Sequence, residues 1–185
     1  MQQEVQYREI EKDELTLELF SEFKRRQEVN LCWRREDGQW VIKEDPFIDD
    51  WSREDYQFLV QCLLGTIEKG GLVYGAFVNG KLKGFTSVEA EFLGKNKDFL
   101  DLTSIHVSQD MRGMGIGKKL FLTAADWARQ HGAKRLYISS HSAAETQNFY
   151  RSLGCADTSE PIAEHVEREP YDCQLEYNLT EPKQS

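Results

Sequence analysis

Asp98-Phe-Leu-Asp-Leu-Thr-Ser-Ile-His-Val107, followed by Ser108-Gln-Asp-Met-Arg-Gly-Met-Gly-Ile-Gly-Lys-Lys-Leu-Phe-Leu122, is the stretch that decides the fold of this chain. Its first ten residues mix β-branched and large apolar side chains without a helical period, which predicts a strand. From Ile116 to His131 apolar residues recur at helical spacing, which predicts a helix. Three glycines within five residues join the two, so the unit reads strand, glycine loop and helix.

The glycine loop predicts an anion site. Its amides can converge at the positive end of the following helix, where free N–H groups and the macrodipole favour a phosphate. Two well-known phosphate loops do not fit. A Walker loop needs glycine where the chain has Arg112 and Ser or Thr where it has Lys119. The dinucleotide fingerprint needs a third glycine at position 118, which is lysine.

The loop resembles the pyrophosphate loop of the GNAT superfamily of N-acetyltransferases, whose pattern is Arg or Gln, two residues, Gly, one residue, then Gly or Ala. Arg112, Gly115 and Gly117 occupy the three defined places. The similarity continues on both sides of the loop and covers about half of the chain. Ile105 to Val107 stand where the family's bulged central strand ends, and 148–155, Asn-Phe-Tyr-Arg-Ser-Leu-Gly-Cys, resembles its Phe-Tyr-x-x-Leu-Gly-Phe segment.

Two positions depart from the family pattern. Gln109 stands where the family usually has proline, and Cys155 follows Leu153-Gly154 where an aromatic residue is usual. Neither position touches a phosphate in the family, so the departures leave the expected cofactor unchanged.

The resemblance implies acetyl-CoA as co-substrate and no metal. The pyrophosphate is expected on the loop residues Arg112, Gly113, Met114, Gly115, Ile116, Gly117 and Lys118. The main chain of Ile105, His106 and Val107 is expected to pair with the pantetheine amides and to polarise the thioester carbonyl, if the strand bulges as it does in the family. An ordinary strand and a plain tight connection are the structural alternatives.

Tyr150 is the predicted proton donor for the leaving thiolate. A phenol has a pKa of about 10, near that of a thiol at about 8.5, and is neutral at physiological pH. Helical spacing alone favours core packing for this tyrosine. The match of Phe149-Tyr150 and Leu153-Gly154 to the family favours catalysis.

The candidate bases are carboxylates on neighbouring strands. Asp101 lies on the central strand, and Glu89 or Glu91 lies on the strand before it. The family often places a carboxylate there to take the ammonium proton, directly or through water. Solvated strand carboxylates are the alternative, His106 is another candidate, and many members of the family need no dedicated base.

Strand patterns surround the organising unit. The runs 72–78 and 82–92 are separated by Asn79-Gly80, the strongest short hairpin signal, and with 98–107 they predict an antiparallel meander. Residues 135–140 read as a short strand, and apolar and polar residues alternate over 172–179.

Helix signals complete the pattern. Asp13 is a candidate N-cap, and Ser52 and Ser142 each open a capping-box pattern, with Asp55 and Glu145 at the third position. Residues 26–50 carry no clear element, and Pro46 excludes a continuous helix there. The predicted class is α/β (mixed α+β), with a GNAT-like, mostly antiparallel sheet of six to seven strands and helices on both faces.

Length, composition and charge restrict the number of domains, the partners and the location that can be expected. A chain of 185 residues with 39% hydrophobic residues suits a single domain over 1–185, with 1–70 as a helical acceptor-side region and 71–180 as the sheet core with the acetyl-CoA site. A net charge of −9 disfavours nucleic acid. Four scattered cysteines and the lack of a signal-like or membrane-spanning run predict a cytoplasmic protein without a membrane partner. A homodimer is left open.

The leading hypothesis is an N-acetyltransferase that moves an acetyl group from acetyl-CoA to a primary amine of a small molecule or peptide, by direct attack in a ternary complex. The alternative is a non-catalytic sensor or interaction module that binds acyl-CoA. A nucleotide-binding protein ranks third, because both nucleotide fingerprints fail.

Overall fold

The computed structural model describes residues 3–180, so 1–2 and 181–185 of the expected 1–185 domain lie outside the described residues. A seven-stranded sheet has the order β1-β4-β5-β6-β7-β9-β8. The strands are β1 (Val5–Glu9), β4 (Leu72–Val78), β5 (Lys81–Val88), β6 (Phe99–Val107), β7 (Arg135–Ser140), β9 (Cys173–Asn178) and β8 (Ala156–Asp157). Neighbours are antiparallel except for the parallel pair β6 and β7. The predicted mixed, mostly antiparallel sheet is confirmed.

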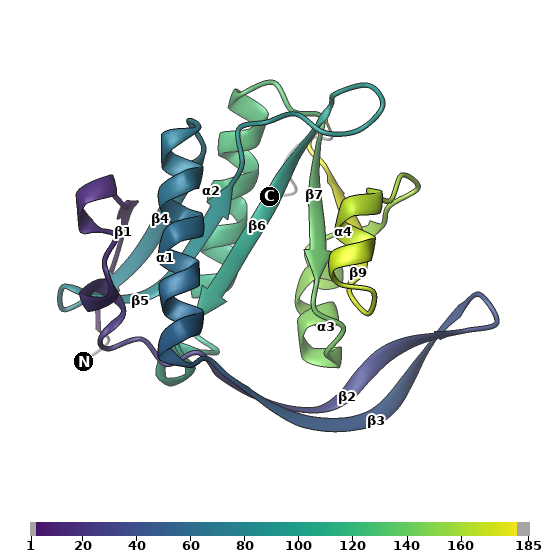
Figure 1. The fold of residues 1–185 in the computed structure, drawn as a ribbon, viewed down its shortest axis with the longest axis horizontal. Coiled ribbons are helices and arrows are strands. Elements are labelled where there is room, and N and C mark those ends of the chain that lie inside the picture. Colours follow the sequence, from purple (N-terminus) through teal and green to yellow (C-terminus); the bar gives the residue numbers. More distant parts are fainter. Residues whose placement is uncertain (1–2, 181–185) are drawn as a thin grey trace.

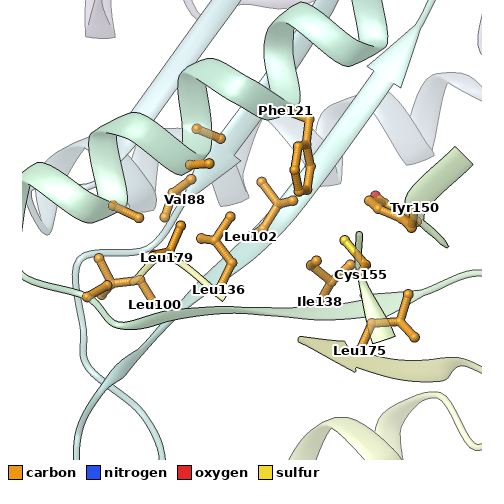
Figure 2. Packing of buried hydrophobic residues seen from close by; sticks show 14 of the residues in the cluster. Val88, Leu100, Leu102, Phe121, Leu136, Ile138, Tyr150, Cys155, Leu175 and Leu179 are labelled. Atoms are coloured by element: carbon orange, nitrogen blue, oxygen red, sulfur yellow. The ribbon is translucent and has the colours of Figure 1, made fainter. Parts of the chain in front are cut away.

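Helices cover both faces of the sheet, as predicted. They are α1 (Arg53–Glu68), α2 (Ile116–Gln130), α3 (Ala144–Ser152) and α4 (Ala163–Arg168). In Figure 1, α1 crosses in front of β4 and β5, and α2 lies behind the sheet. Leu63 of α1 packs into a cluster with Phe77 and Phe85. Phe121 of α2 packs into a separate cluster with Leu102, shown in Figure 2.

The sheet opens between β6 and β7. These strands pair only at Phe99–Asp101 with Arg135–Tyr137, whereas β7 stays paired with β9 to its end. A register shift in the pairing of β6 with β5 leaves Thr103 as an extra residue between Leu102 and Ser104. This β-bulge sits just beyond the point at which β6 and β7 separate.

The predicted hairpin turn is confirmed. Asn79 and Gly80 have φ values of 51° and 75°, the left-handed conformation that both central residues of such a turn require. The second strand ends at Val88, before the predicted Phe92. The chain turns there instead, with positive φ at Gly94 and Lys97.

One of the two predicted capping boxes is confirmed. Ser52 Oγ accepts from the Asp55 amide at 3.2 Å, and the Asp55 carboxylate accepts from the Ser52 amide at 2.7 Å. The second prediction is wrong, because α3 follows an N-cap, Ala143, that has no side-chain hydrogen bond. Ser142 Oγ instead accepts from Arg34 Nη1 at 2.7 Å.

The description of residues 1–70 as helical needs a correction. Residues 26–50 form a long two-stranded ribbon, β2 (Arg26–Glu36) and β3 (Gln39–Asp50), which runs below the sheet in Figure 1. The predicted N-cap Asp13 is wrong, because it lies inside a short 3₁₀ helix, η1 (Lys12–Glu14), whose N-cap is Glu11. A second 3₁₀ helix, η2 (Leu17–Phe20), follows instead of an α-helix. Pro46 falls at a register shift of the ribbon, where a strand tolerates a missing N–H. The division of the domain at residue 70 stays a prediction.

Candidate functional site

The opening between β6 and β7 contains a cavity of about 530 Å³. It is bounded by the glycine loop, by β6 and β7, and by α3. Of the residues predicted to bind cofactor or donate a proton, ten line this cavity: Ile105, His106, Val107, Arg112, Gly113, Gly115, Ile116, Gly117, Lys118 and Tyr150. Met114, also predicted, is outside its lining, and its side chain is 52% exposed.

The glycine loop has the backbone that a diphosphate cradle needs. Gly113 and Gly115 have φ values of 79° and 82°, and a Cβ at either position would meet nothing within 4 Å. Gly115 is the N-cap of α2 and supplies no side-chain cap, so the start of this helix keeps its positive end for an anion. Arg112 lies beside the loop, and burial, with Arg25 nearby, lowers the pKa of its guanidinium. The loop therefore fits the pyrophosphate of coenzyme A.

β6 offers an unpaired edge to the cavity. Ile105, His106 and Val107 pair with β5 on one side, but β7 has already separated from β6 on the other. The bulge at Thr103 precedes these residues and lines the same cavity. Main-chain groups on this edge can therefore pair with an amide-containing arm, which an ordinary interior strand could not do.

Tyr150 lies at the inner wall of the cavity on α3. Only 8% of the residue is exposed, and its ring packs beside Phe121 and Phe149. Figure 2 shows it at the end of the apolar cluster near Cys155 and Ile138. Burial raises the pKa of Tyr150 above its usual value, so the phenol keeps its proton at physiological pH. Tyr150 therefore belongs both to the packed core and to the wall of the cavity.

The three predicted carboxylates, Asp101, Glu89 and the exposed Glu91, are all outside the lining of the cavity. Asp101 Oδ2 accepts a hydrogen bond from His165 Nε2 of α4 at 2.6 Å, and this hydrogen bond raises the pKa of the His165 imidazole. Glu89 follows β5 and accepts from Thr66 Oγ1 at 2.6 Å and from Thr103 Oγ1 at 3.4 Å. Glu89 therefore lies beside Thr103, a residue of the bulge that lines the cavity and whose hydroxyl has Ser87 Oγ as a nearer partner at 2.8 Å, whereas Asp101 is engaged with α4.

The environment of His106 argues against its use as a base. Its Nδ1 accepts a hydrogen bond from Arg25 Nε at 3.1 Å, which places the ring proton on Nε2. Burial, together with Arg25 and Arg112, lowers the pKa of His106 to about 3. The imidazole is neutral, and its acceptor nitrogen is already used. Sequence reasoning missed Arg25, which precedes the ribbon in a segment without a recognisable motif.

His106 is expected to make the protein sensitive to acid. Its folded pKa of about 3 lies below the unfolded value of 6.5, so between these values the unfolded state binds the extra proton and stability is lost as the pH falls. The free energy of unfolding of the wild type should fall more steeply than that of His106→Gln, by up to about 1.4 kcal/mol per pH unit. Urea unfolding at several pH values across this window measures both slopes, and parallel slopes would contradict the assignment.

The described residues contain neither a metal-binding cluster nor a membrane-spanning helix. Within 3–180, no group of His, Cys, Asp and Glu side chains is arranged to hold a metal ion. No helix in that range combines the length and apolar character needed to cross a bilayer.

Comparisons with known proteins agree with this geometry. Residues 7–155 match the model of the Acetyltransferase (GNAT) family. No curated protein matches the sequence. Among solved structures, nourseothricin acetyltransferase is 19% identical with a TM-score of 0.64, over 93% of this chain and 95% of that one.

Two other solved structures contain the cofactor. A putative streptothricin acetyltransferase from Bacillus anthracis, in complex with acetyl coenzyme A, is 15% identical with a TM-score of 0.67, over 94% of this chain and 96% of that one. The PaiA N-acetyltransferase from Thermoplasma acidophilum, in complex with coenzyme A, is 15% identical with a TM-score of 0.59, over 95% and 99%. The cradle, the open strand edge and the family match lead to one conclusion: the chain belongs to the GNAT family of acetyltransferases, which use acetyl-CoA as co-substrate.

Proposed function

We propose that the protein is an N-acetyltransferase that moves an acetyl group from acetyl-CoA to a primary amine of a small molecule or peptide. The observation that carries this proposal is the single cavity that joins the glycine loop, the free edge of β6 and the phenol of Tyr150. Anion binding, orientation and proton donation are thereby available within one space. We also propose a cytoplasmic location, because all four cysteines are free thiols, as is usual in a reducing compartment.

The residues divide the work as follows. Acetyl-CoA supplies the acetyl thioester when it is bound. The loop amides, Arg112 and Lys118 hold its diphosphate, and the edge of β6 orients the arm that leads to the thioester. A main-chain N–H of β6 beyond the bulge polarises the carbonyl oxygen. Tyr150 holds a proton at Oη for the sulfur as the carbon–sulfur bond breaks.

The acceptor must lose a proton to attack. An acceptor that arrives as an ammonium gives this proton to a base or to water. The neutral amine then forms the new carbon–nitrogen bond and loses a second proton as the carbon–sulfur bond breaks. We propose Glu89 as this base, acting through Thr103 or a water, because its carboxylate lies beside Thr103, which lines the cavity. Asp101 is the second candidate for this base. Its hydrogen bond with His165 also suits a role in which Asp101 positions α4.

The cysteines favour direct attack over an acyl-enzyme. Burial raises the pKa of Cys155 to about 12 and that of Cys173 to about 11. Both thiols therefore stay protonated at physiological pH and are poor nucleophiles. Steady-state kinetics should give intersecting double-reciprocal lines, and parallel lines would argue for a covalent relay.

Release of the free thiol from acetyl-CoA, measured across a panel of primary amines, tests the proposal. Turnover that depends on an amine, with mass spectrometry of the amide product, supports it. The alternative is a sensor that binds acyl-CoA without turnover. Tight binding of acetyl-CoA by calorimetry, without stimulation of thiol release by any amine, would select the sensor.

A further inference from the structure

Arg25 occupies a fixed position at the edge of the cavity. Its backbone is held on both sides, because its amide donates to Tyr56 Oη at 3.1 Å and its carbonyl accepts from the Trp51 amide at 3.0 Å. The side chain lines the cavity, although only 9% of it is exposed. A buried guanidinium in a cavity wall needs polar partners there, because removal of a charge from water is costly.

The guanidinium has one terminal nitrogen without a partner. Nε donates to His106 Nδ1 at 3.1 Å, and Nη2 donates to Asp49 Oδ2 at 3.2 Å. Nη1 is buried and has no hydrogen-bond partner among the described residues. The Asp49 side chain is 30% exposed, so its carboxylate is partly hydrated and neutralises the guanidinium incompletely.

Arg25 and Arg112 are two cationic groups near each other, with the carboxylates of Asp49 and Glu145 beside them. His106 stays neutral, because burial, Arg25 and Arg112 lower its pKa to about 3. Arg25 also lies close enough to Arg112 to lower the pKa of that guanidinium. The attraction for an anion therefore comes from the buried and incompletely paired guanidinium of Arg25 itself, in a chain with a net charge of −9.

Arg25 approaches the cavity from the face of the sheet opposite the glycine loop. His106, its partner, packs against Trp51 and Phe85 with ring centroids 4.6 and 5.4 Å apart. Phe85 and Trp51 belong to the cluster beneath α1. The glycine loop begins α2, which covers the other face. The Arg25 side chain is thus on the α1 side of β6, whereas the glycine loop leads into α2 on the other side.

We propose that Arg25 binds a carboxylate of the acceptor, so that the substrate is an amine that also carries an acid group. This inference rests on the proposed amine acetylation. The carboxylate would supply the acceptor that Nη1 lacks, in a charge-assisted hydrogen bond. A singly charged carboxylate suits the site better than a phosphate dianion, because Asp49 already shares the guanidinium.

Amino acids and their matching carboxamides, tested as paired acceptors, measure the effect. In the wild type kcat/KM for the acid should exceed that for the amide by roughly 10- to 100-fold, the usual weight of a hydrogen bond to a charged group. Arg25→Met should bring the ratio close to one, and Arg25→Lys should keep part of it. Arg26→Gln is the matched control, because Arg26 pairs with Glu28 and is outside the cavity lining. It should leave the ratio unchanged.

Other outcomes separate this proposal from the function on which it rests. A wild-type ratio of one or below overturns it, whether or not Arg25→Met folds. Weaker coenzyme A binding in Arg25→Met with an unchanged ratio assigns Arg25 to the cofactor and also overturns it. If no amine is acetylated, propionate becomes the probe: with coenzyme A present it should shift the NMR signals of His106 in the wild type but not in Arg25→Met. An unshifted wild-type spectrum overturns the carboxylate site independently of turnover.

Discussion

Replacement of Tyr150 by phenylalanine is expected to lower kcat for amine acetylation by about 100-fold or more, within the usual range for loss of a general acid. The variant keeps the ring, which packs beside Phe121 and Phe149, and loses only the hydroxyl. Burial raises the pKa of this phenol, so the wild-type group is protonated throughout the working pH range. The expelled thiolate would then have to take its proton from water.

Thiol release under saturating substrates measures this loss, and calorimetry with coenzyme A shows whether binding is retained. Tyr177→Phe is the matched control, because Tyr177 packs on Phe121 in the same cluster and is outside the cavity lining. Its kcat should stay close to that of the wild type. Equal rates in Tyr150→Phe and the wild type would remove Tyr150 from the mechanism and return it to core packing.

Gly115→Val is expected to weaken coenzyme A binding by about 100-fold or more. Gly115 has a φ value of 82°, which a β-branched residue strongly disfavours, so the backbone of the loop must rearrange. Loss of two amide hydrogen bonds to a charged diphosphate accounts for an effect of this order. Calorimetric titration with coenzyme A gives the dissociation constant directly.

Gly132→Val is the control that distinguishes loss of the coenzyme A cradle from backbone strain alone. Gly132 lies just beyond the other end of α2, has a φ value of 89°, and a Cβ there would also meet nothing within 4 Å. Both variants should lose thermal stability to a similar degree, but only Gly115→Val should lose coenzyme A binding. A similar loss of affinity in both would mean that strain, rather than the cradle, is responsible.

The local signals in the sequence identified most of the sheet core and the helix that follows the glycine loop. The predicted strands 72–78 and 135–140 match β4 and β7 at both ends, and the predicted helix from 116 matches α2 at its start. These elements carry their own periodicity and turn residues. The Asn79-Gly80 turn also needed no tertiary information, because its positive φ values are a local requirement.

The ribbon of β2 and β3 was not predicted, although the sequence of its turn is a hairpin signal. Asp37 and Gly38 have φ values of 49° and 76°, so Asp-Gly was a hairpin signal of the same kind. The flanking strands did not read as strands, because charged residues surround Trp33 and Trp40 and the ribbon has no large sheet to pack on. Its tryptophans contact residues that are distant in the sequence. Trp33 and Trp40 pack against the main apolar cluster, and Trp40 Nε1 donates a hydrogen bond to Asp157.

Part of the site was also beyond local reasoning. The contacts of Arg25 with His106, and of Asp101 with His165, join residues 81 and 64 positions apart. Such pairs are set by how the ribbon and α4 dock on the sheet. The family pattern predicted the residues of the glycine loop and suggested carboxylates as bases, but it gave no sign of Arg25 or of the contact between Asp101 and His165.

The brief pairing of β6 with β7 has a wider consequence. Three residue pairs join the two blocks of the sheet, and beyond them the main chain of β6 faces a gap. A pantetheine arm carries amides at its own spacing and can complete the pattern that a neighbouring strand would otherwise complete. Under the proposed function the co-substrate would fill the gap between β6 and β7, and the sheet would be complete only while the co-substrate is bound.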